Sequence, residues 1–509
     1  MATRRKSNGP RSRSGCITCK LRHVKCDEAK PSCSRCQRTG LKCDGYDNAS
    51  QSQLRQRMEA IQHQPRRPPI SADHQIILRP ETREERRCAD FFHAETTQAF
   101  SGFFDSTLWS YLIPQISEGE PMIRHAMIAI GAFHAGFEDR ALVDTSFALQ
   151  QYNKAIRHLI DRKSVPSSQD WELALAACCL FIGLEILRGN KKQALDHIDA
   201  GLKMLCQHEL KGAAVGRTTE VYGELRQLLS RLNLQASFMG RLLYPLECSS
   251  QDAAATGPTL ANLSQARRHL DRLMNKGLMF IRSTDSNRNP QDVQLRQKQV
   301  IEQRELCLEF DNWLAALNKL VQKMGPWIQQ KDLRASLVLR IYHRVALIWI
   351  RTVLAPDEGI FDLYIPDFDV LTGYAERAIQ LTTAIEKQTN NQSRFSLEGE
   401  LIATLYFSAV RCRNPGIRRR AIDLLSRYGK IEGMWNAKRY AAVATYVMET
   451  EEGACSGIVK TEKDVGVRAR IYECIQPSGM EQNPCQVILL FKLDGGGHDF
   501  QRRIGFVHW

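Results

Sequence analysis

Six of the chain's 16 cysteines are crowded into one short segment near the N-terminus, and this crowding is the strongest constraint in the sequence. The segment, CITCKLRHVKCDEAKPSCSRCQRTGLKC, holds two copies of C-x2-C-x6-C joined by six residues. Two cysteines at C-x2-C spacing can bring both sulfurs to one metal ion at about 2.3 Å. The pattern therefore predicts a metal-binding module whose ligands are Cys16, Cys19, Cys26, Cys33, Cys36 and Cys43.

The number of cysteines predicts how the metals share them. Tetrahedral zinc takes four ligands, so six thiolates cannot fill two separate sites. Two zinc ions can each have four sulfurs if two of the thiolates bridge them. The internal twofold symmetry of the pattern indicates one bridging thiolate from each half. Six thiolates and two Zn²⁺ then leave a net negative charge that the surrounding basic residues more than offset.

Positive charge is concentrated in the same part of the chain. Residues 1–43 contain twelve Lys and Arg but only two Asp and Glu, whereas the whole chain has a formal net charge of +14. The basic residues continue between the cysteines, where they lower thiol pKa values and favour metal binding. Basic charge confined to a small cysteine-rich module predicts a polyanion as its partner.

Two observations concern the cellular compartment. The N-terminus, MATRRKSNGPRSRSG, lacks the apolar stretch of a signal peptide. The longest apolar run, residues 173–184, is shorter than the ~20 residues of a membrane span. We therefore expect a soluble intracellular protein without a membrane partner, in a reducing compartment where thiols are metal ligands or free core residues. Cys178 and Cys179, in an apolar helical pattern, are expected to be core thiols.

Residues 16–46 resemble the DNA-binding module of the fungal binuclear zinc cluster (Zn2Cys6) transcription factors. All six cysteine spacings agree, and Pro31 matches the family's proline in the loop between the two halves. The resemblance implies two zinc ions bridged by Cys16 and Cys33. It also implies a nuclear transcription factor of RNA polymerase II genes that reads CGG-like triplets in the major groove of double-stranded DNA.

In this family the basic stretch after the second cysteine reads the DNA. The resemblance therefore assigns DNA binding to Lys20, Arg22, His23 and Lys25. Many members have Lys or Arg at the position of His23. A permanently charged donor reads guanine O6 and N7 well, whereas a neutral imidazole offers one donor and one acceptor. His23 is thus expected to contact guanine more weakly, or to touch only phosphate or solvent.

The sequence divides into five parts by composition. Residues 1–15 are expected to be a disordered basic tail and residues 16–46 the zinc module. Residues 47–82 form a linker rich in Gln, Arg and Pro. Leu54, Met58 and Ile61 share a helical face in this linker, but the seam is too short for a coiled coil.

A helical region is expected over 83–450, and a terminal segment with a β-hairpin over 451–509. Apolar residues recur at helical spacing through most of the region. Residues 171–188 and 191–206 are expected to form an antiparallel helical hairpin. No repeat period supports a solenoid. The acidic stretch METEEG, 448–453, is interpreted as a solvated linker.

The terminal segment has a strand pattern. GVRARIYECI and CQVILLFKL are rich in β-branched and apolar residues, and RIGFVHW is a candidate to join them. The fold class is therefore mainly α: a small zinc module, a flexible linker and a large helical region with a short C-terminal strand pair.

Two other classes of function remain as alternatives. One is an enzyme or metabolite-binding helical protein with an appended zinc module, but we find no catalytic constellation in residues 83–509. The other is an RNA-binding cluster, which usually adds aromatic residues for stacking, and residues 16–43 contain none. The helical region resembles the family's regulatory region in pattern and position. That implies dimerisation, effector response or restraint of activation, and contact with the transcription machinery, without choosing among them.

Overall fold

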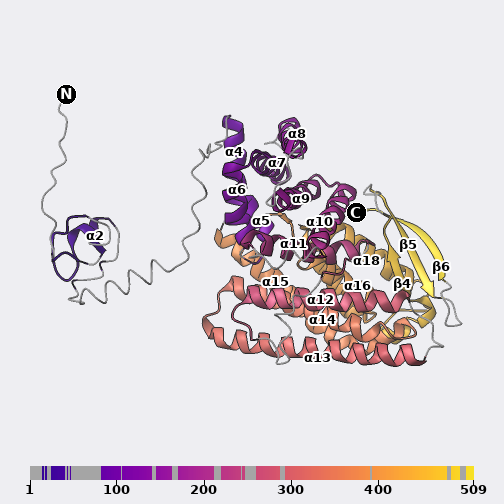
Figure 1. The fold of residues 1–509 in the computed structure, drawn as a ribbon. Coiled ribbons are helices and arrows are strands. Elements are labelled where there is room, and N and C mark those ends of the chain that lie inside the picture. Colours follow the sequence, from indigo (N-terminus) through magenta and orange to yellow (C-terminus); the bar gives the residue numbers. More distant parts are fainter. Residues whose placement is uncertain are drawn as a thin grey trace. The chain divides into compact units, whose positions relative to one another are not determined.

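A computed structural model of the 509-residue chain divides into two compact units, Met1–Gln75 and Ile76–Trp509 (Figure 1). The structure describes residues 14–16, 18–19, 24–39, 43, 46, 82–104, 106–139, 145–162, 170–210, 219–241, 244–246, 259–286, 293–389, 393–477, 483–492 and 500–509. The seam of Leu54, Met58 and Ile61 lies outside these residues.

The second unit begins with a helical layer that packs around α7. A capping box formed by Thr82 and Glu85 starts the first helix of this layer. Two π-helical turns, Phe92–Thr96 and Leu108–Leu112, interrupt the layer. Its helices are α4 (Arg83–Phe91), α5 (Thr97–Ser101), α6 (Ile113–Gly119), α7 (Pro121–Glu138), α8 (Thr145–Arg162), α9 (Asp170–Leu187), α10 (Lys191–Leu210) and α11 (Glu220–Phe238).

Long helices follow and pack on one another. α12 (Leu263–Ser286), α13 (Val293–Met324) and α14 (Gln330–Thr352) contact each other pairwise and lie along the lower edge of the unit in Figure 1. The chain then continues through α15 (Ile365–Thr389), α16 (Ile402–Arg411), α17 (Pro415–Tyr428) and α18 (Ala437–Glu452). The mainly helical fold that the apolar periodicity predicts is confirmed.

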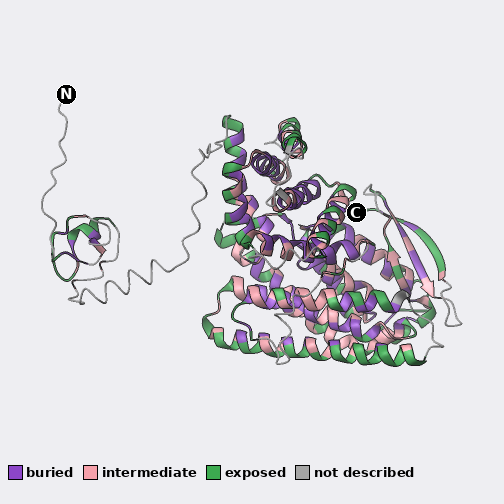
Figure 2. Ribbon diagram, viewed as in Figure 1, coloured by how far each residue is buried: buried purple, intermediate pink, exposed green. Residues whose placement is uncertain are grey.

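Three hydrophobic clusters hold the helical unit together. The first joins α4 to α11, the second lies among α14 to α18, and the third lies among α12, α13 and α14. Figure 2 shows the consequence for α13, whose outer side is exposed along most of its length, while the helices above it mix buried, intermediate and exposed residues. The predicted hairpin is confirmed as α9 and α10, which pack together across the turn at Gly189.

The C-terminal strands form a three-stranded antiparallel sheet. β4 (Ile471–Ile475) pairs with β5 (Cys485–Lys492), and β5 pairs with β6 (Phe500–Val507). The predicted strand pair is therefore confirmed, and RIGFVHW contributes to a third full strand. The inner face of the sheet packs on α18. Gly505 is required in β6 because a Cβ there would lie 2.2 Å from the Tyr446 hydroxyl.

A second, smaller sheet consists of very short strands. β1 (Phe395–Ser396) pairs in parallel with β2 (Ile431–Glu432), which pairs antiparallel with β3 (Trp435–Asn436). The buried Glu432 carboxylate accepts hydrogen bonds from the backbone N–H groups of Glu400, Leu401 and Ile402 at 2.9–3.1 Å. These donors lack intrahelical partners at the start of α16, so Glu432 caps that helix from β2.

The acidic stretch at 448–453 is not a solvated linker, and that prediction is wrong. Residues 448–452 are the last turn of α18, and Glu451 is fully buried. Its carboxylate pairs with Arg413, at 2.9 Å, and with Arg418, and it accepts the N–H of Ile471 at 2.7 Å. Arg413 and Arg418 are themselves buried, so Glu451 connects α17 and β4 through the core.

Cys178 and Cys179 are buried in α9, as expected for core thiols. Burial raises the pKa of the Cys178 thiol to about 12, and the pKa of Cys179 is raised as well. Among the described residues, no helix combines the length and the apolar character that crossing a membrane requires.

Candidate metal centre

The metal centre is formed by sulfurs that converge in the first unit. The described part of its backbone includes a short helix, α2 (Ser34–Arg38), which begins at the N-cap Cys33. Five of the six cysteines are buried, and Cys43 is half-buried. The structure therefore brings together all six cysteines that the spacing singled out.

The sulfurs form two groups of four. One group contains Cys16, Cys19, Cys26 and Cys33, and the other contains Cys16, Cys33, Cys36 and Cys43. In each group all Sγ atoms lie within 4.8 Å of one another, and the Sγ atoms of Cys16 and Cys33 are 3.6 Å apart. Zinc–sulfur bonds of 2.3 Å require sulfurs ~3.8 Å apart in a tetrahedron. The donor set therefore fits two zinc ions that share Cys16 and Cys33.

The same backbone hydrogen bonds recur in both halves of the module. In each half, the N–H of the first cysteine donates to the sulfur of the third. The N–H of the second cysteine donates to the sulfur of the first. The distances are 3.4 Å for Cys16 N to Cys26 Sγ, 3.5 Å for Cys33 N to Cys43 Sγ, 3.4 Å for Cys19 N to Cys16 Sγ and 3.3 Å for Cys36 N to Cys33 Sγ. The sequence repeat is thus a structural repeat, and its donated bonds favour thiolates.

The pKa values of the ligand thiols shift in different directions in this environment. Burial opposes ionisation of Cys26, but hydrogen bonds from the N–H groups of Cys16 and Glu28 lower its pKa to about 7. Burial raises the pKa of the Cys33 thiol to about 12. Several crowded, buried thiols cannot all ionise without a nearby cation. A bound metal ion supplies that charge, because the ligand form of cysteine is the thiolate.

Two residues that support the centre were not predicted from the sequence. Asp27 accepts the N–H groups of Ser34, at 3.0 Å, and Arg35, at 3.1 Å, and so caps α2. The hydrogen bonds from Ser34 and Arg35 lower the pKa of Asp27 to about 2. The Tyr46 hydroxyl lies 3.7 Å from Cys26 Sγ and donates to the carbonyl of Ala29 at 2.8 Å. The sequence offered a signal for Asp27, because it directly follows a ligand cysteine and precedes a short helix.

The predicted DNA-binding residues are only partly described. Lys25 is exposed on the surface of the module. Lys20, Arg22 and His23 lie outside the described residues.

Comparison with known proteins gives two family matches. Residues 14–53 match the fungal Zn(2)-Cys(6) binuclear cluster domain. Residues 87–355, more than half of the chain, match the fungal specific transcription factor domain. This chain belongs to the fungal Zn(2)-Cys(6) transcription factors. The cofactor of this family's cluster is zinc, in agreement with the two four-sulfur groups.

Individual relatives support the assignment to the Zn(2)-Cys(6) transcription factors. The aspercryptin biosynthesis cluster-specific transcription regulator atnN of Emericella nidulans is 23% identical to this chain over 91% of each protein. The transcription regulator lscL of Purpureocillium lilacinum is 26% identical over 38% of this chain and 49% of its own length. The transcriptional regulatory protein moc3 of Schizosaccharomyces pombe is 48% identical over 8% of each chain. No solved structure matches the chain.

Proposed function

We propose that this transcription factor binds double-stranded DNA in the nucleus and reads CGG-like triplets at RNA polymerase II genes. The observation that carries the proposal is the pair of four-sulfur groups that share Cys16 and Cys33 beside a basic segment. In this proposal the six cysteines hold two zinc ions. The zinc ions supply no redox chemistry, and their role is to fix the fold of a module without a large apolar core.

Charge supports DNA as the partner of the module. Residues 1–43 carry twelve basic and two acidic side chains, so a large positive excess remains after the thiolates and zinc are counted. Basic side chains around the cluster bind phosphates and hold the module in register, while base contacts set the sequence. We assign base or phosphate contacts to Lys20, Arg22, His23 and the exposed Lys25.

Selection of bound sites from random duplex DNA by the full chain tests the specificity. The expected result is enrichment of a triplet with adjacent guanines, alone or in pairs. Lys25→Ala should weaken binding by about 1–3 kcal/mol if Lys25 contacts a base. Arg38→Ala removes the same charge from the exposed end of α2. It should weaken binding to all DNA sequences about equally. Selection without any sequence enrichment would reject the proposal.

The proposed role of His23 has a separate test. If its imidazolium contacts guanine or phosphate, DNA affinity should rise as pH falls through about 6.5, the ordinary histidine pKa. His23→Lys should tighten binding and remove this pH dependence. Equal affinities of the two proteins between pH 5.5 and pH 8 would show that His23 contacts neither group.

The match to atnN along most of both chains favours a whole-length regulator over an enzyme with an appended zinc module. We infer further that the targets are a group of biosynthesis genes, as the name of that relative states for its own targets. Comparison of transcripts with and without this gene should then show a coordinated loss from such a group. A response limited to scattered, unrelated genes would contradict the inference.

A further inference from the structure

The helical unit contains two adjoining cavities. An apolar cavity of about 220 Å³ lies among α11, α12, α14, α16 and β4, and a smaller cavity of about 60 Å³ lies beside it. The residues that line both are Leu234, Phe238, Met274, Tyr342, Ala403 and Trp435. Because they share these residues, the two cavities are adjacent, and we call them the larger and the smaller chamber.

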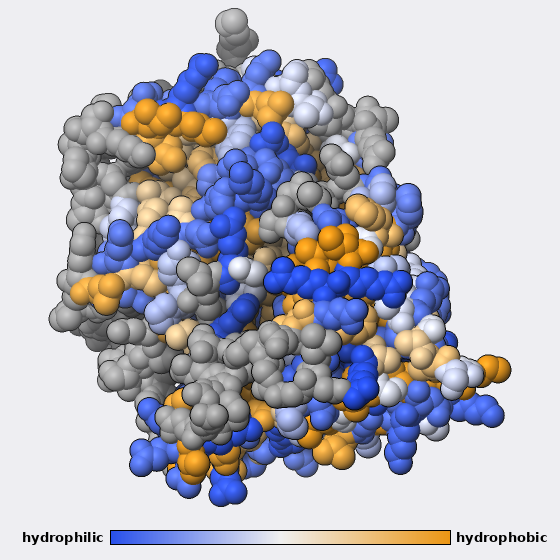
Figure 3. All heavy atoms as spheres, turned by 90° about the vertical axis from the view of Figure 1, so that its right-hand side faces the viewer, coloured by the Kyte–Doolittle hydropathy of each residue, from blue (hydrophilic) through white to orange (hydrophobic). Residues whose placement is uncertain are grey.

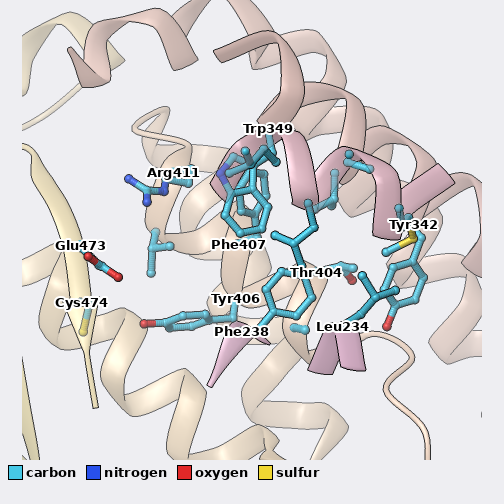
Figure 4. Close-up of a pocket in the computed structure, with 18 of the residues that line it drawn as sticks. Leu234, Phe238, Tyr342, Trp349, Thr404, Tyr406, Phe407, Arg411, Glu473 and Cys474 are labelled. Atoms are coloured by element: carbon cyan, nitrogen blue, oxygen red, sulfur yellow. The ribbon is translucent and has the colours of Figure 1, made fainter. Parts of the chain in front are cut away.

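Aromatic rings form the middle of the larger chamber. Figure 4 shows Phe238, Trp349 and Phe407 there, with Arg411 and Glu473 at one end and Tyr342 at the other. Trp349 stacks on Phe238 with ring centroids 5.5 Å apart. Glu473 is exposed, so the Arg411 end is the side nearest to solvent. Phe238 and Phe407 offer no hydrogen-bonding groups to water, which needs two to four polar partners.

The smaller chamber carries polar groups without partners. Tyr342 lines both chambers, and its hydroxyl forms no hydrogen bond with the residues that the structure describes. Gln235 is only 8% exposed, and its Oε1 atom has no hydrogen-bond partner among the same residues. Buried polar groups are normally paired, so this end is suited to a hydrogen-bonding group of a bound molecule.

The charged residues of the smaller chamber already have partners. Arg231 pairs with Glu398 at 2.7 Å, and Arg267 pairs with the same carboxylate. Glu400 accepts a hydrogen bond from the Arg334 guanidinium at 3.3 Å. A ligand with a net charge would have to break one of these buried pairs or remain unpaired in the core. An uncharged ligand avoids both costs.

We propose that the two chambers form one binding site for an uncharged, mostly apolar molecule of one or two rings. Its rings occupy the larger chamber, and a hydroxyl, carbonyl or amide group faces Tyr342 and Gln235. The size follows from the volume, because an apolar cavity of about 150 Å³ accommodates benzene. This ligand site is independent of which DNA sequence the zinc module reads.

Calorimetric titration of the full chain with 2-naphthol tests the site. We expect saturable binding of one molecule per chain, and at least tenfold weaker binding of naphthalene-2-sulfonate, which has the same rings but a permanent charge.

Ala346→Phe places a ring in the larger chamber and should abolish binding of 2-naphthol. Tyr342→Phe should weaken binding about three- to tenfold, because it removes one hydrogen bond. Tyr374→Phe, on α15 outside both chambers, is the control and should bind like the wild type.

Several outcomes would overturn the proposal. One is the absence of saturable heat with 2-naphthol up to its solubility limit. Another is unchanged binding by Ala346→Phe. If that variant does not fold, Tyr342→Phe decides, because loss of an unpaired hydroxyl leaves the packing of the core intact. Equal affinity of Tyr342→Phe and the wild type for 2-naphthol would then reject the assigned orientation and the site.

Discussion

Cys16 and Cys33 differ from the other ligand candidates because each belongs to both four-sulfur groups. Cys43 belongs to one group and is half-buried. A substitution at a shared sulfur therefore removes a ligand from two sites, whereas a substitution at Cys43 removes a ligand from one. Within each half of the module, the first cysteine therefore differs from the other two, because it alone belongs to both groups.

We expect Cys33→Ser to lose both zinc ions and Cys43→Ser to retain close to one per chain. Zinc measured by atomic emission on the purified full chain checks this. Cys307→Ser, in the half-buried part of α13, is the control and should keep two. The assignment of Cys33 as a bridging ligand would be wrong if Cys33→Ser and Cys43→Ser retained equal amounts of zinc.

Glu400 is a buried carboxyl group whose titration should be visible in stability. Burial, with the charge of Glu432 nearby, raises the pKa of Glu400 from 4.5 to about 8. Between these two values the folded state keeps a proton that the unfolded state has lost. Stability should therefore fall as pH rises from about 4.5 to 8, by up to about 1.4 kcal/mol per pH unit.

We predict that Glu400→Gln flattens this dependence, because glutamine resembles the protonated carboxyl group and cannot ionise. Urea unfolding of the helical unit within the full chain, at several values between pH 5 and 8, measures the effect. Glu449→Gln, at an exposed position of α18, should leave the slope unchanged. Parallel curves for Glu400→Gln and the wild type would show that Glu400 ionises normally in the folded state.

At the scale of elements, α18 organises the C-terminal part of the unit. One face of the helix packs on the sheet β4–β5–β6, and Glu451 near its end joins Arg413, Arg418 and the backbone of Ile471. Removing one partner of a buried ion pair leaves an uncompensated charge in the core. Glu452 is the next residue and pairs with the half-exposed Arg419.

Glu451→Gln should therefore destabilise the helical unit by about 3–5 kcal/mol. Glu452→Gln should cost at most about 1 kcal/mol, because its partner Arg419 is half-exposed and the pair is screened by water. Urea denaturation followed by circular dichroism compares the two neighbouring variants under identical conditions. Equal losses of stability would mean that the buried cluster does not hold the sheet to the helices.

The elements that follow from local patterns were predictable. Helix periodicity and the Gly189 turn predict α9 and α10, and alternating apolar residues predict β4 and β5. The two-residue strands β1, β2 and β3 carry no local pattern, because their pairing depends on contacts distant in sequence. The acidic end of α18 was misread for the same reason, since its partner arginines lie on α17 and in the residues just before it.

The candidate site shows the same division. Metal-ligand spacing is local, so the sequence alone singles out the six cysteines that the structure brings together. The hydroxyl of Tyr46, by contrast, reaches Cys26 from outside the repeat. The cavity beside Tyr342 could not be predicted from the sequence. Its wall is made of parts of five elements that are distant in sequence: α11, α12, α14, α16 and β4.

At the scale of the whole molecule, association is expected to depend on the helical unit. Val300, Ile301 and Leu308 of α13 are 44%, 60% and 56% exposed. At 100° per residue, Ile301 and Leu308 lie on the side opposite to the buried Phe310 and Leu306, and Val300 lies at the edge of that side. The linker offers only Leu54, Met58 and Ile61, and so few apolar residues do not offset the cost of association.

We predict that residues 1–70 are monomeric at micromolar concentration and that the full chain forms any dimer through α13. Sedimentation of both proteins tests this, with Ile301→Asp/Leu308→Asp expected to dissociate the full-length dimer. Ile160→Asp, at a comparably exposed position of α8, serves as the control. A stable dimer of residues 1–70 that is lost on Leu54→Ala would contradict the prediction and restore a short coiled coil in the linker.

The late position of β4 in the sequence has a consequence for synthesis. The zinc module ends before residue 76, whereas the buried Glu451 lacks one of its hydrogen-bond donors until Ile471 has been made. At 5–20 residues per second, ribosomes need about 20–80 s to cover this interval. The DNA-binding module can therefore take up zinc and fold while the helical unit is still an incomplete nascent chain. Zinc supply during translation, rather than the stability of the finished helical unit, should then set the yield of the DNA-binding form.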